Sequence, residues 1–291
     1  MRKLLASILN IGAVVTIAVV GSTPAFAVVI EGIDFGALGD VRIGTATLGQ
    51  TYVNGVGETQ TAYGLVSTIN GATKYCADGS ANCALYYVAT STVSATPSGG
   101  GIGTTTYGTG TQFTLYYSGA PAVNTLNQSS AANLAFVTSL TPWATLRGEN
   151  GIDPTAAGLV SDQRQEATLS GATVSQFGNR LLSINTTDGL GLNAAEAFLN
   201  ANTIPTFTGA FADVEFNTSG NTLVVNPFDV ANGAADSCLT GSPQVGDYCF
   251  QGSSDFRGMT TAVPGAAPLP GTLALVGLGL LGLRAVRWKG W

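Results

Sequence analysis

The chain has 291 residues, of which 10% are charged against about 25% in typical soluble domains, and 39 are glycine, roughly twice the average usage. Five of its 11 basic residues lie in the first three and last eight positions, so residues 28–261 hold six basic against 17 acidic residues, a formal charge of −11. This balance argues against nucleic acid and anionic lipid surfaces as partners, because both are bound through lysine and arginine.

The N-terminal segment, residues 1–27, has the pattern of a secretory signal peptide. Arg2 and Lys3 form a basic start, a largely apolar stretch follows, and Ala25 and Ala27 provide an A-x-A cleavage site. An uncleaved anchor helix is the alternative, but polar residues interrupt the apolar stretch and a proline follows it. We therefore expect export through the Sec translocon and a mature chain that begins directly after Ala27.

Residues 28–261 are predicted to form a mainly β domain. Phe113, Leu115 and Tyr117 alternate with polar neighbours, as in a strand with two unlike faces. Asn-Gly and Asp-Gly pairs recur along the chain and favour tight turns between strands. Further strand candidates, rich in β-branched and aromatic residues, are 63–69, 85–88, 211–216 and 222–225. Together these patterns predict an antiparallel β-sandwich, jelly-roll-like in its connections.

One or two short helices are expected to interrupt the strands. Their predicted caps are Asn193 with Glu196, a capping box before 194–199, and Ser129 or Ser130 before 131–137. A glycine- and threonine-rich stretch at 96–110 is interpreted as a flexible loop. No repeat of 20 to 50 residues is visible, which disfavours a solenoid or a propeller.

Four cysteines occur as two close pairs, Cys76 with Cys83 and Cys238 with Cys249. Four cysteines allow three pairings, and in an exported chain local pairing is the simplest. Neither spacing is the C-x-x-C of redox or zinc sites. We therefore predict the structural disulfides Cys76–Cys83 and Cys238–Cys249.

The sequence contains no histidine, which removes the Ser-His-Asp triad and the Cys-His dyad. Asp213 and Glu215 lie two residues apart on a predicted strand, so both are expected on one solvated face. Paired acids of this kind can hydrolyse glycosidic bonds, which keeps a secreted carbohydrate-active enzyme as the alternative. We predict no catalytic residue and no enzymatic activity.

Metal binding is a weak possibility. Exported, acidic chains often bind calcium, and two loose oxygen clusters are present, but the D-x-[DN]-x-[DN]-G loop is not. The clusters are Asn185, Asp188 and Asn193, and Asp229, Asn232 and Asp236. We predict no cofactor and no metal site, with a calcium-dependent carbohydrate-binding module as the alternative.

The last residues have the pattern of a membrane-stop tail. A linker at 262–267 leads to Pro268, Leu269 and Pro270, and an apolar stretch then includes Leu273 and Leu283. The basic residues that follow it are Arg284, Arg287 and Lys289. Such residues stay on the cytoplasmic side, so the domain before the tail is expected outside the membrane.

This tail resembles the PEP-CTERM sorting signal, in which a Pro-Glu-Pro tripeptide precedes a short apolar helix and terminal arginines. The resemblance covers residues 263–291, and one position departs, because Leu269 stands where the family has glutamate. The resemblance implies handover to an exosortase-like membrane transpeptidase. It also implies an inner-membrane-anchored precursor that reaches the cell surface or extracellular matrix of a Gram-negative bacterium.

Stretches at 186–191 and 252–258 are similar to segments of PEP-CTERM proteins linked to bacterial flocculation. That resemblance implies a non-enzymatic surface or matrix protein that associates with exopolysaccharide and aids flocculation or biofilm formation. The many Ser, Thr and Asn residues favour hydrogen bonding to sugars. Exposed aromatic residues can also stack on sugar rings, although aromatic residues on strands more often belong to the core. The candidates are Tyr86, Tyr87, Tyr116 and Tyr117.

Overall fold

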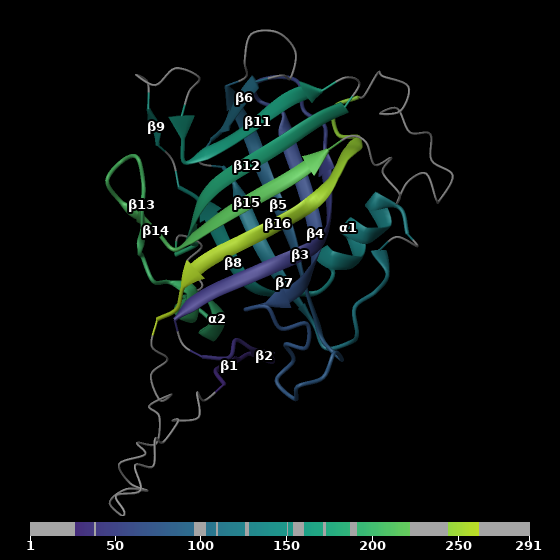
Figure 1. The fold of residues 1–291 in the computed structure, drawn as a ribbon, viewed down its shortest axis with the longest axis vertical. Coiled ribbons are helices and arrows are strands. Elements are labelled where there is room, and N and C mark those ends of the chain that lie inside the picture. The colour runs from purple at the N-terminus through teal and green to yellow at the C-terminus, as the bar shows by residue number, and fades with distance from the viewer. Residues whose placement is uncertain are drawn as a thin grey trace, which may run out of the picture. The chain divides into compact units, whose positions relative to one another are not determined.

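The fold is taken from a computed structural model of the chain (Figure 1). The structure describes residues 27–261 with gaps at 38, 96–102, 109, 126–127, 150, 154–159, 171–172, 187–190 and 222–243. The predicted signal peptide before Ala27, the linker, the sorting tripeptide and the membrane-stop helix therefore lie outside the described residues. None of the helices inside the described ranges is long and apolar enough to cross a membrane.

The strands are β1 (Val29–Ile30), β2 (Ile33–Asp34), β3 (Asp40–Thr51), β4 (Thr59–Ile69), β5 (Ala84–Ala95), β6 (Gly103–Tyr107), β7 (Gln112–Ser118), β8 (Thr141–Gly148), β9 (Ile152–Asp153), β10 (Val160–Ser161), β11 (Gln163–Ser170), β12 (Thr173–Ile184), β13 (Ile204–Pro205), β14 (Phe211–Ala212), β15 (Val214–Asn221) and β16 (Tyr248–Met259). The helices are α1 (Ser130–Thr138) and α2 (Ala194–Leu199).

In the described part of the chain, ten strands form one antiparallel sheet in the order β11-β6-β5-β4-β3-β16-β15-β12-β8-β7. β5 pairs with β4 along one edge, and along the other with β7 and then β6. β12 likewise pairs with β15 along one edge, and along the other with β11 and then β8. Because β6 also pairs with β11 and β7 with β8, the sheet closes on itself.

The closed sheet is flattened into two layers. β3, β16, β15, β12 and β11 form the front layer of Figure 1, and β4 to β8 form the back layer, whose strands cross behind them. The predicted mainly antiparallel β-sandwich with short inserted helices is thereby confirmed.

Aromatic rings fill the space between the layers. The ring of Phe113 in the back layer stacks on Tyr87 with centroids 5.2 Å apart. The same ring lies 4.8 Å from Phe216 and 5.5 Å from Phe256, both in the front layer. All four side chains are nearly inaccessible to solvent, so this cluster is a central contact between the two layers.

The two layers differ on their outer faces. α1 packs on the outside of β5, where Val137 and Phe136 cover Ala84 and Tyr86. β5 is therefore buried on both faces at its start, which explains its continuous apolar run. None of the described helices or strands covers the outer face of the front layer, and that face is polar.

One end of the sandwich is closed by apolar packing against α2. Phe35 lies between Trp143 and Phe198, with ring centroids 5.7 and 4.9 Å away. Asn193 accepts a hydrogen bond from the Glu196 backbone, and Glu196 accepts one from the Asn193 backbone, so the predicted capping box is confirmed. The cap of α1 at Ser129 is confirmed as well.

The C-terminal end of the domain is fastened at this same place. The backbone N–H of Thr260 donates to the Gly39 carbonyl, and that of Thr261 donates to the Phe198 carbonyl, both at 2.9 Å. The hydroxyl of Thr261 also donates to the Ala197 carbonyl at 2.7 Å. β1, the first strand of the domain, packs against α2 too.

The interior near β6 and β11 is polar. Arg180 is 3% exposed, and its guanidinium lies 4.6 Å from the centre of the Tyr107 ring and donates to Gln60 Oε1 at 2.8 Å. No carboxylate among the described residues pairs with it. Burial lowers the pKa of Arg180 and raises the pKa of Tyr107 to about 12.

The predicted loop at 96–110 is wrong for residues 103–107, which form β6. Thr106 and Tyr107 are buried there, because β6 fills the gap between β5 and β11. The remainder of that loop is only partly described, and the strand expected at 222–225 falls in a gap.

The disulfide Cys76–Cys83 is present. Cys249 is also disulfide-bonded, but Cys238 lies outside the described residues, so the pairing Cys238–Cys249 stays a prediction.

Candidate functional site

The outer face of the front layer carries the most developed polar arrangement of the described residues. We call it the polar face. Its members come from β3, β16, β15 and β12: Arg42, Ser253, Asp255, Arg257, Glu215, Asn217, Ser219, Phe177 and Asn179.

Strand register arranges these side chains in three parallel rows. Arg42, Arg257 and Glu215 form the first row, Asp255, Asn217 and Asn179 the second, and Ser253, Ser219 and Phe177 the third. Because side chains on one face of a strand recur every second residue, neighbouring rows lie side by side and can exchange hydrogen bonds.

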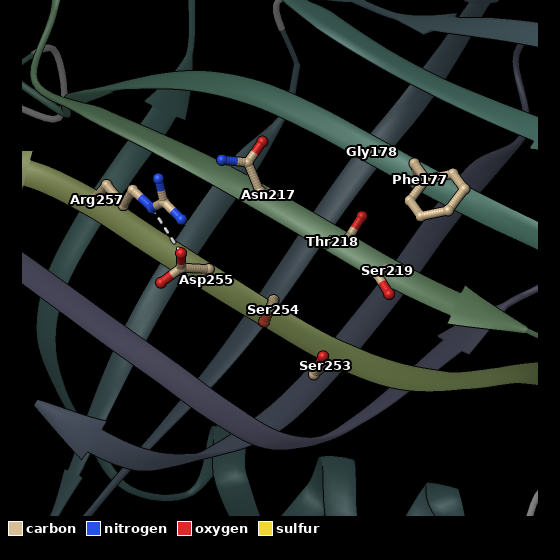
Figure 2. Close-up of a pocket in the computed structure, with 9 residues that line it drawn as sticks. All are labelled: Phe177, Gly178, Asn217, Thr218, Ser219, Ser253, Ser254, Asp255 and Arg257. Atoms are coloured by element: carbon tan, nitrogen blue, oxygen red, sulfur yellow. Dashed lines mark hydrogen bonds and ion pairs between the residues drawn. The ribbon is translucent and has the colours of Figure 1, made fainter. Parts of the chain in front are cut away.

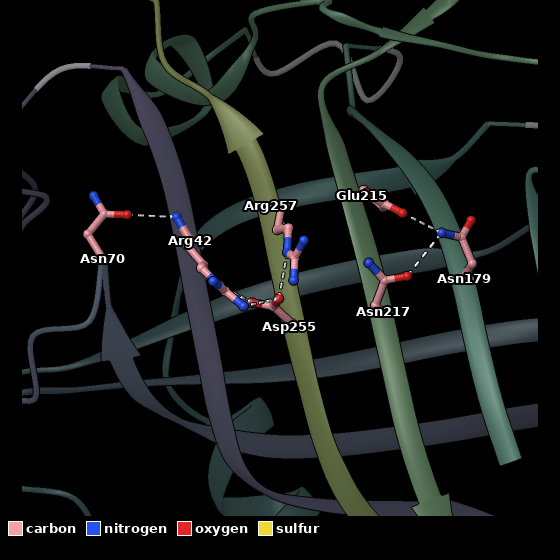
Figure 3. Close-up of polar contacts among 7 residues, drawn as sticks. All are labelled: Arg42, Asn70, Asn179, Glu215, Asn217, Asp255 and Arg257. Carbon is pink, nitrogen blue, oxygen red and sulfur yellow. Dashed lines mark hydrogen bonds and ion pairs between the residues drawn. The ribbon is translucent and has the colours of Figure 1, made fainter.

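Asp255 holds the two arginines of the first row (Figure 3). Its carboxylate accepts from Arg42 Nε at 3.2 Å and Nη2 at 3.1 Å, and from Arg257 Nε at 2.6 Å. The arginine side chains are 62% and 53% exposed, so each pair contributes at most about 1 kcal/mol to stability. The main effect is geometric, because the pairs fix two planar guanidinium groups along the sheet surface.

A second hydrogen-bonded group lies on the adjoining strands (Figure 3). Asn179 Nδ2 donates to Glu215 Oε1 at 2.6 Å and to Asn217 Oδ1 at 3.0 Å. The Asn217 amide nitrogen is thereby turned toward solvent as a donor.

Between these groups and Phe177 the face is hollowed (Figure 2). The hollow has a volume of about 320 Å³, at the lower end of the range for small-molecule sites. Figure 2 shows Phe177 at one end and the Arg257–Asp255 pair at the other, with Ser219 and Ser253 between them. The small side chains of the two serines leave the space open.

The predicted acid pair is separated by the structure. Asp213 is 1% exposed, and its carboxylate accepts from the backbone N–H groups of Ile184 at 2.8 Å and Asn202 at 2.6 Å. Burial raises the pKa of Asp213. The prediction of a shared solvated face is wrong for Asp213, because the strand bends there and the side chain turns in to bind backbone. Glu215 does lie on the polar face.

Two of the four tyrosines that were predicted to stack on sugar rings cannot do so, because they are buried. Tyr86 and Tyr87 are both fully buried, Tyr86 beneath α1 and Tyr87 in the central aromatic cluster. Tyr116 and Tyr117 are half-buried. Tyr116 packs against the apolar residues beneath α1, and Tyr117 packs against the main core. The aromatic residue exposed on the polar face is Phe177, at 60%, which no pattern in the sequence indicated.

Within the described ranges, no group of three or more histidine, cysteine or acidic residues is placed to hold a metal ion. Asn193, one member of the loose clusters, is occupied as the cap of α2. Asp188, Asp229, Asn232 and Asp236 lie outside the described residues.

Comparison with known proteins identifies the C-terminal segment. Residues 266–289 match the PEP-CTERM protein-sorting motif. No curated protein and no solved structure is significantly similar to the chain. The motif implies an exported, membrane-anchored precursor at a bacterial cell surface, processed by an exosortase, which is a membrane protein.

Proposed function

We propose that this exosortase-sorted surface protein is a non-enzymatic component of the cell surface or extracellular matrix of a Gram-negative bacterium. There it helps to retain exopolysaccharide and supports flocculation or biofilm formation. The observation that carries the proposal is the sorting motif at 266–289, which directs a sandwich with a wide polar face to the cell exterior. The sequence has no histidine, and the carboxylate of Asp213 is engaged by backbone N–H groups, which supports a binding role over hydrolysis.

The proposal is tested with a strain that lacks the gene. We expect the strain to form fewer aggregates and to release polysaccharide that wild-type cells retain, with both restored by the wild-type gene. Unchanged aggregation and retention would contradict the proposal. Shortening of the producer's polysaccharide by purified protein, abolished in Glu215→Gln, would establish the enzyme instead.

Sorting makes a separate prediction about the tail. A chain that ends at residue 262 is expected to be exported but lost to the medium, because it lacks the motif and the basic stop after it. Leu269→Glu restores the residue typical of the motif and is expected to leave surface display equal or improved. Cell fractionation with immunoblotting measures both. Surface levels of the truncated chain equal to wild type would show that the tail has no sorting role.

A further inference from the structure

We propose that the hollow on the polar face binds a neutral polysaccharide, with Phe177 against the face of a sugar ring and Arg257, Asp255 and Asn217 at its hydroxyls. This inference rests on the proposed function, to which it adds a class of polysaccharide and a binding site.

The hollow has room for one sugar ring above the serines with a face turned to Phe177. Phe177 pairs across the strands with Ser219, and Ser219 with Ser253, so a large apolar ring stands beside two small side chains. Phe177 is 60% exposed although its backbone is fully paired in the sheet. A sugar ring resting on the serines would cover the exposed face of Phe177 and remove apolar surface from water.

The polar end of the hollow offers hydrogen bonds that the protein itself does not use. Arg257 donates to Asp255 through Nε, which leaves both Nη groups without a partner among the described residues. Asn217 uses its oxygen toward Asn179 and keeps its amide N–H groups. Planar groups of this kind can bind neighbouring hydroxyls in pairs.

Charge selects a neutral ligand over an acidic one. On the polar face the two arginines, Arg42 and Arg257, are balanced by Asp255 and Glu215, so the face has no net charge at pH 7. The residues between the signal peptide and the linker carry −11 overall, six basic against 17 acidic. An acidic polysaccharide would therefore be repelled by the domain without compensation at the hollow, whereas a neutral one would meet no electrostatic penalty.

The test uses the full mature chain in mild detergent and the producer's exopolysaccharide, separated by anion exchange into a neutral and an acidic fraction. Binding of each fraction is measured by affinity electrophoresis at low and high salt. Wild-type protein is expected to bind the neutral fraction with little dependence on salt. Phe177→Ser is expected to weaken that binding about tenfold, because the stacking surface is lost. Arg257→Gln is expected to weaken it severalfold.

Matched controls separate the site from general effects. Phe211→Ser removes a phenylalanine of similar exposure, 54%, on β14, and Arg147→Gln removes an exposed arginine on β8 in the back layer. Both are expected to bind like wild type, and thermal melting checks that all variants are folded.

Equal binding by Phe177→Ser and wild type would overturn the site. Salt-sensitive binding of the acidic fraction alone would overturn the ligand class. Loss of self-association in place of sugar binding in Phe177→Ser would assign the hollow to a second copy of the chain. In each of these cases a polysaccharide-retention defect in the deletion strain would still support the proposed function. The absence of that defect would contradict the proposed function.

Discussion

Replacing Phe113 by alanine is expected to lower the free energy of unfolding by about 3–5 kcal/mol, a large share of the roughly 5–15 kcal/mol that stabilises a typical domain. Phe113 is 2% exposed, and its ring contacts Tyr87 in its own layer and Phe216 and Phe256 in the other. The alanine variant therefore loses the central contact between the layers and leaves a cavity that the rigid sheet cannot close.

Guanidinium unfolding followed by tryptophan fluorescence measures this effect. Phe177→Ala is the matched control, since Phe177 belongs to the same sheet but is 60% exposed, and it should change stability by no more than about 0.5 kcal/mol. Similar losses in the two variants would show that the aromatic cluster does not join the layers.

Replacing Asp213 by alanine is expected to cost about 2–4 kcal/mol. The two carboxylate oxygens accept from the buried backbone N–H of Ile184 and the partly buried backbone N–H of Asn202, and a buried donor left without an acceptor costs about 1–3 kcal/mol. Asp255→Ala is the control, because Asp255 lies on the solvated polar face and its ion pairs contribute little. Equal stability of the two variants would contradict the structural role of Asp213.

Asp213 is expected to make the free energy of unfolding depend on pH with a sign opposite to that of most acidic residues. Burial raises the pKa of Asp213 above its ordinary value of 3.8, and burial does the same for Asp162. Between the unfolded and folded pKa values the folded state keeps a proton that the unfolded state has released, so the free energy of unfolding falls as pH rises through that window. The stability advantage of wild type over Asp213→Ala should thus be larger at about pH 4 than at about pH 7. A larger advantage at neutral pH would contradict the raised pKa.

Local features of this fold were predictable from the sequence. The capping box of α2 needs only Asn193 and Glu196, and the disulfide between Cys76 and Cys83 closes a short loop. Each feature joins residues that are close in the sequence, so a local pattern is enough to predict it. Strand alternation at Phe113 and Leu115 likewise indicated the inward face correctly, because the polar Thr114 separates them.

What covers each face was not predictable, because it depends on distant parts of the chain. Tyr86 is buried by α1, and its hydroxyl accepts from the backbone N–H of Val123. β6 forms because it finds partners in β5 and β11, which its own glycines and threonines do not reveal.

The candidate site was hidden for a related reason. On β12 the inward Gln176 and Arg180 are polar, whereas the apolar Phe177 points outward. This is the reverse of the usual alternation, so the pattern does not indicate which face is exposed. These polar side chains can be buried because glutamines on other strands form hydrogen bonds with them: Gln165 with Gln176, and Gln60 with Arg180.

The fastening of Thr260 and Thr261 has a mechanical consequence. The tail leaves the domain at the end of β16, and β16 is hydrogen-bonded along its length to β3 on one side and β15 on the other. A pull on the chain after Thr261 is passed into β16, and the component of that pull along the strand loads both ladders in shear, so that their bonds resist together. The anchoring bonds to Gly39 and Phe198 add resistance at the point where the force enters. Because rupture under load is governed by the unfolding rate, this placement would lengthen the lifetime of the folded domain whenever its C-terminal end is pulled.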